Sequence, residues 1–184
     1  DVVVHCAASI DQRNPTTTYT NIIMFENVAR VFKGKLLYFS SGAALRGDPP
    51  TDPYGLSKWI VDRRIETIPN ARTLRIWGCY GPGELETRFS AVCRKDGHVI
   101  IKKDKYFDFV DVEKVKDVVA KYVDGELDEK EINIVDPHTR LLSEWAVFFG
   151  ATYEVLESGY DVPYTHPNFR LGGTSTIISD SKSM

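Results

Sequence analysis

The chain has 184 residues, with 23 Lys and Arg against 26 Asp and Glu, so its formal charge is −3. Hydrophobic residues make up 42% of the chain and charged residues 27%, which is close to average globular proteins and unlike disordered chains. This balance argues against a nucleic-acid-binding module and against a polybasic membrane-surface protein, because both concentrate Lys and Arg on one face. We therefore expect a folded protein with no nucleic acid and no membrane among its partners.

Three cysteines, Cys6, Cys79 and Cys93, follow no zinc or Cys-x-x-Cys spacing, and the histidines lack ligand spacing as well. We therefore predict no metal site. No apolar run approaches the ~20 residues of a membrane helix, and no secretory signal pattern is present. Together with the free thiols, these features predict a cytoplasmic protein.

The first part of the chain alternates predicted strands with predicted helices. Small residues follow the strands, at the carboxyl ends where α/β folds bind ligands. This alternation predicts an α/β fold with a Rossmann-like, doubly wound parallel sheet. Apolar runs predict strands at residues 2–8, 35–39 and 72–77, and apolar residues three and four apart predict helices at 21–32 and 54–65. Thr51 or Asp52 can cap the second helix, and Pro53 suits its first turn.

Beyond residue 83 the pattern is less regular. The Gly78–Gly83 segment is rich in small residues and predicts a turn. The elements predicted after it are helices at 88–95, 113–123 and 143–149, the last capped by Ser143, and strands at 98–102, 107–112 and 132–135.

Tyr54 and Lys58 lie four residues apart on a predicted helix, so their side chains project from one face. A free tyrosine has a pKa of ~10 and exchanges protons poorly at neutral pH. A neighbouring ammonium favours the phenolate and brings that pKa toward the useful range. Ser41 or Ser40, at the end of the preceding strand, would hold a substrate oxygen beside the phenol. This grouping predicts a proton-transfer site for interconverting an alcohol and a carbonyl, although such a pair alone is commonly a half-buried aromatic beside a solvated charge.

The order of these motifs resembles the extended short-chain dehydrogenase/reductase family, in its NAD-dependent epimerase/dehydratase branch that acts on nucleotide sugars. The matching pieces are residues 1–8 (DVVVHCAA), Asn21, residues 39–43 (FSSGA), 53–58 (PYGLSK), Leu74-Arg75, 80–83 (YGPG) and 108–112 (DFVDV). The resemblance implies a cofactor domain over residues 1–83 and, over 84–184, mainly a small α+β substrate lobe with interleaved Rossmann elements. It also implies that the family's GxxGxxG turn precedes residue 1, because these 184 residues contain no such pattern.

The resemblance also implies roles for individual residues. Tyr54 would be the catalytic acid/base, Lys58 would bind the nicotinamide ribose and lower the pKa of Tyr54, and Ser41 would orient the substrate. The register of the loop allows Gly42 at the Ser41 position if residues are counted back from Gly47. NAD or NADP would contact Ala7, Ala8, Ser40, Tyr54, Lys58, Trp77, Gly78, Cys79 and Tyr80, and the substrate would contact Gly42, Ala43 and Arg88.

Departures from the family narrow the predicted reaction. Gly42 and Ala43 stand where sugar-nucleotide dehydratases carry Asp-Glu, which argues against dehydration. Ala43 also replaces the cysteine of the GDP-fucose synthase type. The predicted function that remains is a nucleotide-sugar epimerase or 4-keto-sugar reductase, with reversible hydride transfer to NAD or NADP. The resemblance also implies a homodimer. The alternative is a non-catalytic dinucleotide-binding sensor or scaffold of the same fold.

Overall fold

The computed structural model describes residues 1–168. The chain forms two compact units. Unit 1 contains Asp1–Ile76 and Val118–Asn133, and unit 2 contains Trp77–Asp117 and the described part of Ile134–Met184. The predicted division of function at Gly83 stays a prediction, and residues 169–184 of the predicted substrate lobe lie outside the described part.

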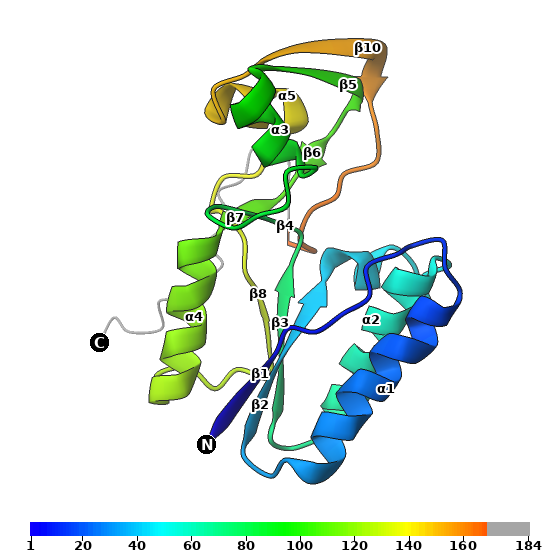
Figure 1. Cartoon of the computed structure of the whole chain (residues 1–184), viewed down its shortest axis with the longest axis vertical. Coiled ribbons are helices and arrows are strands. Elements are labelled where there is room, and N and C mark those ends of the chain that lie inside the picture. Colours follow the sequence, from blue (N-terminus) through cyan, green and yellow to red (C-terminus); the bar gives the residue numbers. More distant parts are fainter. Residues whose placement is uncertain (169–184) are drawn as a thin grey trace. The chain divides into compact units, whose positions relative to one another are not determined.

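Unit 1 is built on a parallel sheet with strand order β1-β2-β3-β8. Figure 1 shows α1 and α2 on one side of this sheet and α4 on the other. This arrangement is a doubly wound α/β sheet, which confirms the predicted fold class. The bounds are β1 (Val2–His5), β2 (Lys35–Ser41), β3 (Ala71–Ile76), β8 (Glu131–Asn133), α1 (Thr16–Val31), α2 (Pro53–Glu66) and α4 (Val112–Asp124).

The start of α2 is fixed by local chemistry. The Asp52 side chain accepts a hydrogen bond from the Gly55 backbone N–H at 2.8 Å, and Pro53 occupies the first turn. Of the two predicted caps, the structure uses Asp52. A Cβ on Gly55 would lie 2.8 Å from the Ala43 carbonyl oxygen. Only glycine therefore lets α2 pack this closely on the 3₁₀ turn η1 (Gly42–Leu45) that follows β2.

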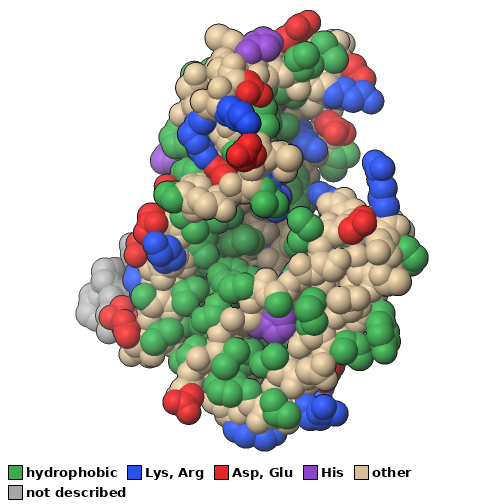
Figure 2. Space-filling view, in the orientation of Figure 1, with side chains coloured by type: hydrophobic (Ala, Val, Ile, Leu, Met, Phe, Trp, Pro, Cys, Tyr) green, Lys and Arg blue, Asp and Glu red, His purple; other side chains and the backbone are tan. Residues whose placement is uncertain are grey.

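The core of unit 1 lies between the sheet and its two helices. It contains Phe25, Leu36, Tyr38, Val61, Ile65 and Ala71. The buried His5 ring packs edge-on against Tyr38, with 5.6 Å between the ring centroids. His5 is thus a packing residue. Figure 2 shows hydrophobic side chains exposed over β1, where Val4 is 38% exposed.

Helix α1 begins at Thr16, five residues earlier than predicted. The Asn14 carbonyl accepts the Thr17 N–H at 3.0 Å, and the Asn14 side chain accepts the Thr16 N–H at the same distance. Asn21, expected near the first residue of the helix, instead lies inside it and is buried. The polar run that precedes Asn21 shows no apolar spacing, so the sequence pattern missed this first turn.

In its described residues, unit 2 contains three strand pairs and two whole helices. Strands β4 and β7 pair in parallel, as do β5 and β10, whereas β6 and β9 pair antiparallel. No helix in residues 1–168 has the length and apolarity needed to cross a membrane. The bounds are β4 (Gly78–Tyr80), β5 (His98–Asp104), β6 (Tyr106–Phe107), β7 (Phe109–Asp111), β9 (Arg140–Leu141), β10 (Thr152–Tyr160), α3 (Phe89–Asp96) and α5 (Leu142–Phe148).

Two details of unit 2 correct the sequence predictions. Residues 78–80 form a strand rather than a turn, because their backbone pairs with Phe109–Asp111. Ser143 is not the cap of α5: the helix begins at Leu142, and the Glu144 carboxylate accepts the Leu141 N–H at 2.8 Å. The Ser143 hydroxyl instead donates to the buried Asp104.

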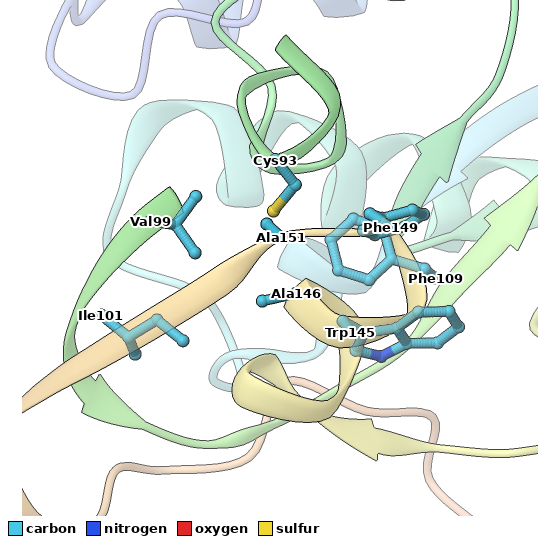
Figure 3. Close-up of a cluster of buried hydrophobic side chains, with 8 residues drawn as sticks. All are labelled: Cys93, Val99, Ile101, Phe109, Trp145, Ala146, Phe149 and Ala151. Carbon is cyan, nitrogen blue, oxygen red and sulfur yellow. The ribbon is translucent and has the colours of Figure 1, made fainter. Parts of the chain in front are cut away.

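Aromatic packing forms the core of unit 2. Trp145 and Phe149 stack with 5.6 Å between centroids, and Phe109 packs edge-on against both. Figure 3 shows this group together with Cys93. Burial raises the pKa of the Cys93 thiol, which marks it as a small core residue. The cluster contains Cys93, Val99, Ile101, Phe109, Trp145, Ala146, Phe149 and Ala151.

We predict that Asp52→Ala lowers the free energy of unfolding by about 1 kcal/mol, because the Gly55 N–H at the start of α2 loses its acceptor. Urea denaturation measures this change. Thr51→Ala, at the exposed neighbouring position, is the matched control and should leave stability nearly unchanged. Equal losses in both variants would contradict the assignment of Asp52 as the cap.

Candidate active site

Helix α2 brings the predicted Tyr54 and Lys58 side chains together. The Nζ atom of Lys58 lies 5.7 Å from the centroid of the half-buried Tyr54 ring. Lys58 is only 4% exposed, and its Nζ donates a hydrogen bond of 2.7 Å to the Phe39 carbonyl oxygen. The ammonium is therefore held between the end of β2 and the first turns of α2.

Burial dominates the electrostatics of Lys58. It lowers the pKa of the Lys58 ammonium from 10.5 to about 8, while the Asp62 carboxylate and the Cys6 thiol act in the opposite direction. The Lys58 Nζ also lies 4.5 Å from the centroid of the Tyr38 ring, at cation–π distance. Burial raises the pKa of the Tyr38 phenol well above its usual value, so this ring stays neutral. At neutral pH Lys58 is mainly an ammonium ion.

The two serines at the end of β2 have different partners. Ser40 donates its hydroxyl to Asp62 Oδ2 at 2.8 Å. Ser41 begins the η1 turn, and its Oγ accepts the Ala43 N–H at 3.2 Å. Neighbouring side chains on a strand point to opposite faces, and Ser40 faces α2. The predicted substrate contacts that follow, Gly42 and Ala43, are buried, and Ala43 is 1% exposed.

Hydrogen bonds tie the segment after β1 to α2. The Asn21 side chain accepts the Ser9 N–H at 2.7 Å and donates to the Ser9 carbonyl at 3.0 Å and to the Ser57 hydroxyl at 2.9 Å. Ser57 in turn donates to the Tyr54 carbonyl at 2.7 Å. Ala7, which is exposed, and Ala8, which is half-buried, lie immediately before this anchor. The backbone that follows Ala7 and Ala8 is thus held by Asn21 of α1, which in turn bonds to the helix that carries Tyr54 and Lys58.

The remaining predicted site residues belong to unit 2. Trp77 and Gly78 are buried, and a Cβ on Gly78 would lie 2.5 Å from a Phe109 ring atom. Gly78 therefore permits close packing of β4 on β7. The Tyr80 ring lies 5.0 Å from the Phe149 ring, so it contributes to the aromatic core.

Cys79 and Arg88 line a pocket of about 270 Å³ in unit 2, together with Tyr80 and the loop that follows it. Burial and the Asp111 carboxylate raise the pKa of the Cys79 thiol, and Arg88 opposes this shift. Arg88 is exposed at the N-cap of α3, where an anion would find both its guanidinium and free N–H groups of the helix.

Two buried polar groups were missed by the sequence analysis. In unit 1, Asp62 pairs with Arg75, and the spacing of Asp62 four residues after Lys58 was an available signal. In unit 2, the Asp108 carboxylate accepts hydrogen bonds from the backbone and the ring Nδ1 of His166, both at 2.6 Å. Their 58-residue separation left no local signal. Within the described residues 1–168, no group of three or more His, Cys, Asp or Glu could hold a metal ion.

No protein-family model matches this sequence, and no curated protein matches it. Several solved structures, in contrast, match the fold of this chain. RMD of Pseudomonas aeruginosa, solved with NADPH, has a TM-score of 0.68 and 19% identity over 85% of this chain and 70% of that one. A dTDP-4-dehydrorhamnose reductase of Bacillus anthracis, solved with NADP, has a TM-score of 0.67 and 17% identity over 84% and 64%. The UDP-glucuronic acid 4-epimerase of Bacillus cereus, solved with UDP-glucuronic acid and NAD, has a TM-score of 0.65 and 19% identity over 89% and 65%.

Such enzymes are members of the extended short-chain dehydrogenase/reductase family. Identities of 13–19% show the fold alone, and the fold is the Rossmann-like one that the sequence predicted. The chain spans 64–70% of the length of the three solved chains named above.

We predict that Lys58→Met removes a pH dependence of stability. The pKa of Lys58 is about 8 in the folded chain and returns toward 10.5 on unfolding, so between these values the unfolded chain binds more protons. Lys58 therefore makes the free energy of unfolding increase as the pH rises through this window. Urea denaturation from about pH 7 to about pH 9.5 should show the wild type gaining stability relative to Lys58→Met.

Lys33→Met, at an exposed lysine of the same unit, controls for the loss of one positive charge. A constant stability difference between the wild type and Lys58→Met across this pH range would contradict the lowered pKa of Lys58.

Proposed function

We propose that this chain carries the proton-transfer site of an NAD(P)-dependent nucleotide-sugar epimerase or 4-keto-sugar reductase of the extended short-chain dehydrogenase/reductase family. The observation that carries the proposal is the buried Lys58 ammonium beside the Tyr54 ring, held by the Phe39 carbonyl. A solvated lysine beside a surface tyrosine would not be buried in this way. The match in fold to enzymes of this kind adds support.

The proposed chemistry is a proton transfer at Tyr54. When the sugar hydroxyl is oxidised, the Tyr54 phenolate takes its proton; when the ketone is reduced, the phenol returns it. The Lys58 ammonium favours the phenolate by its positive charge. It has three N–H donors and uses one for Phe39, which leaves donors for the phenol oxygen and for a ribose hydroxyl. Ser41 donates its hydroxyl to the substrate oxygen.

The residues of unit 1 fit the nicotinamide ribose of NAD or NADP. The Lys58 ammonium supplies donors, and the exposed backbone at Ala7 follows the carboxyl end of β1, where α/β folds bind ligands. The nicotinamide, when bound, supplies or accepts the hydride. Solved relatives of this fold contain NADPH, NADP or NAD.

The proposed substrate class is a nucleotide-linked sugar. UDP and UDP-glucuronic acid are bound in solved structures of the same fold. Arg88 is the proposed diphosphate contact, because an exposed guanidinium at a helix N-cap suits a phosphate. Cys79, Tyr80, Trp77 and Gly78 remain proposed cofactor contacts. A homodimer through α1 and α2 and a cytoplasmic location stay predictions.

We predict that Tyr54→Phe lowers the rate of hydride transfer by about 10²–10⁴-fold or more, because the acid/base hydroxyl is lost while the ring remains. The assay follows the change in absorbance of the nicotinamide after a UDP- or GDP-sugar is added to the protein together with NAD or NADP. Tyr19→Phe, which removes the hydroxyl of an exposed tyrosine on α1, is the matched control and should retain wild-type turnover.

Unchanged turnover in Tyr54→Phe would contradict the role of this hydroxyl. A thermal shift with NAD or NADP that is followed by no response to any sugar nucleotide would contradict the enzyme and favour the sensor or scaffold.

A further inference from the structure

A second charged residue, Asp62, follows Tyr54 and Lys58 on the same face of α2. Asp62 lies four residues beyond Lys58, so the three side chains form one stripe along the helix. The Asp62 carboxylate accepts hydrogen bonds of 2.8 Å from Ser40 Oγ and from Arg75 Nη2. Among the residues described, no donor contacts its second oxygen, Oδ1, which is buried.

Arg75 favours the charged form of this carboxylate. Arg75 is 2% exposed and also contacts Glu131 and the Asn133 side chain, the latter at 3.1 Å. Burial raises the pKa of Asp62, and the Arg75 charge and the two hydrogen bonds oppose that shift. A guanidinium as buried as this needs an anionic partner. Asp62 and Arg75 line a pocket of about 510 Å³ in unit 1. One side of the Asp62 side chain therefore approaches solvent.

The titratable groups around Lys58 come from three elements. Tyr54 and Asp62 lie on α2, Tyr38 lies on β2, and Cys6 follows β1. Burial raises the pKa of both the Tyr38 phenol and the Cys6 thiol, so both are neutral at pH 7. The Lys58 ammonium donates to the Phe39 carbonyl and the Asp62 carboxylate accepts from the adjacent Ser40, so α2 and β2 together hold the two charges near each other. Within residues 1–168, Asp62 is therefore the carboxylate that raises the pKa of Lys58. The charged groups that face Asp62 itself are Arg75 of β3, Lys58 of α2 and Glu131 of β8.

From this arrangement we infer that Asp62 is a positioning residue of the proton-transfer site, whose carboxylate, held by Arg75 and Ser40, keeps the Lys58 side chain in its ammonium form beside Tyr54. The effect on Lys58 is a property of the folded chain. The catalytic consequence rests on the proposed function. Without the Asp62 charge, the Phe39 carbonyl and the Tyr38 ring are the groups in residues 1–168 that offset the cost of burying the Lys58 ammonium.

The test is a titration of Lys58 by carbon NMR in protein with labelled lysine side chains, with the signal assigned by its absence in Lys58→Met. We expect the pKa of Lys58 to fall by about one pH unit in Asp62→Asn, as two charges one helical turn apart at partly buried positions would give. Glu66→Gln removes the next carboxylate on α2, which is exposed and paired with Arg63 at 3.0 Å, and should leave the pKa of Lys58 unchanged.

Asp62→Asn removes one of the two carboxylates that pair with the buried Arg75, which can prevent folding. The double variant Asp62→Asn with Arg75→Gln removes both charges and is expected to lower the pKa of Lys58 as well, because Asp62 shares a face of α2 with Lys58, which bonds to β2, whereas Arg75 comes from the neighbouring strand β3. An unchanged Lys58 pKa in whichever of the two variants is folded would overturn the inference.

The titration needs neither cofactor nor sugar, so its outcome is independent of the proposed reaction. In the complete enzyme, the same variant should shift the basic limb of the rate profile to lower pH. A lower pKa of Lys58 in a protein without sugar-nucleotide activity would uphold the role of Asp62 and contradict only the proposed function.

Discussion

Burial of the Lys58 ammonium is the constraint on which the arrangement of unit 1 depends. A charge that leaves water needs hydrogen bonds and an opposite charge nearby. The Phe39 carbonyl supplies the hydrogen bond at 2.7 Å, the Tyr38 ring supplies a π face, and Asp62 supplies the negative charge one helical turn away. These groups come from β2 and α2, so the helix must lie close against the end of the strand.

Three small features allow this close approach. Asp52 caps α2 where the chain leaves the proline-rich loop, and Gly55 removes the side chain that would strike the Ala43 carbonyl. Asn21 connects the segment after β1 to α2 through Ser57. The site is therefore a consequence of how the first turns of α2 pack on the carboxyl ends of β1 and β2, which is the edge where α/β sheets bind ligands.

Local sequence patterns predicted most of the elements of this fold. The strand and helix alternation, the Pro53 start of α2 and the Tyr54–Lys58 face could all be read from neighbouring residues, since each depends on spacings of four or fewer. Elements held by distant partners were less visible. Strand β4 looked like a turn because Gly78 and Cys79 are small, and β10 was missed because most of its side chains are exposed, so it lacks a run of buried residues.

The electrostatic partners were the hardest to predict. Asp62 and Arg75 meet only after β3 is placed beside β2, and Asp108 and His166 are far apart in the chain. Ser40 and Ser41 could not be separated by sequence, because only the strand geometry shows that Ser40 faces Asp62. The sequence thus identified the main chemical groups of the site, and the structure shows which side chains form hydrogen bonds and ion pairs with one another.

The central claim is that the Lys58 charge acts on the Tyr54 phenol. The most direct measurement is the pKa of Tyr54, followed by carbon NMR of labelled tyrosine in the wild type and in Lys58→Met, with Tyr54→Phe for assignment. We predict that Tyr54 begins to ionise at lower pH in the wild type than in Lys58→Met, because the phenolate has a neighbouring ammonium as long as Lys58, with its pKa of about 8, is protonated. The same Tyr54 pKa in both proteins would contradict it.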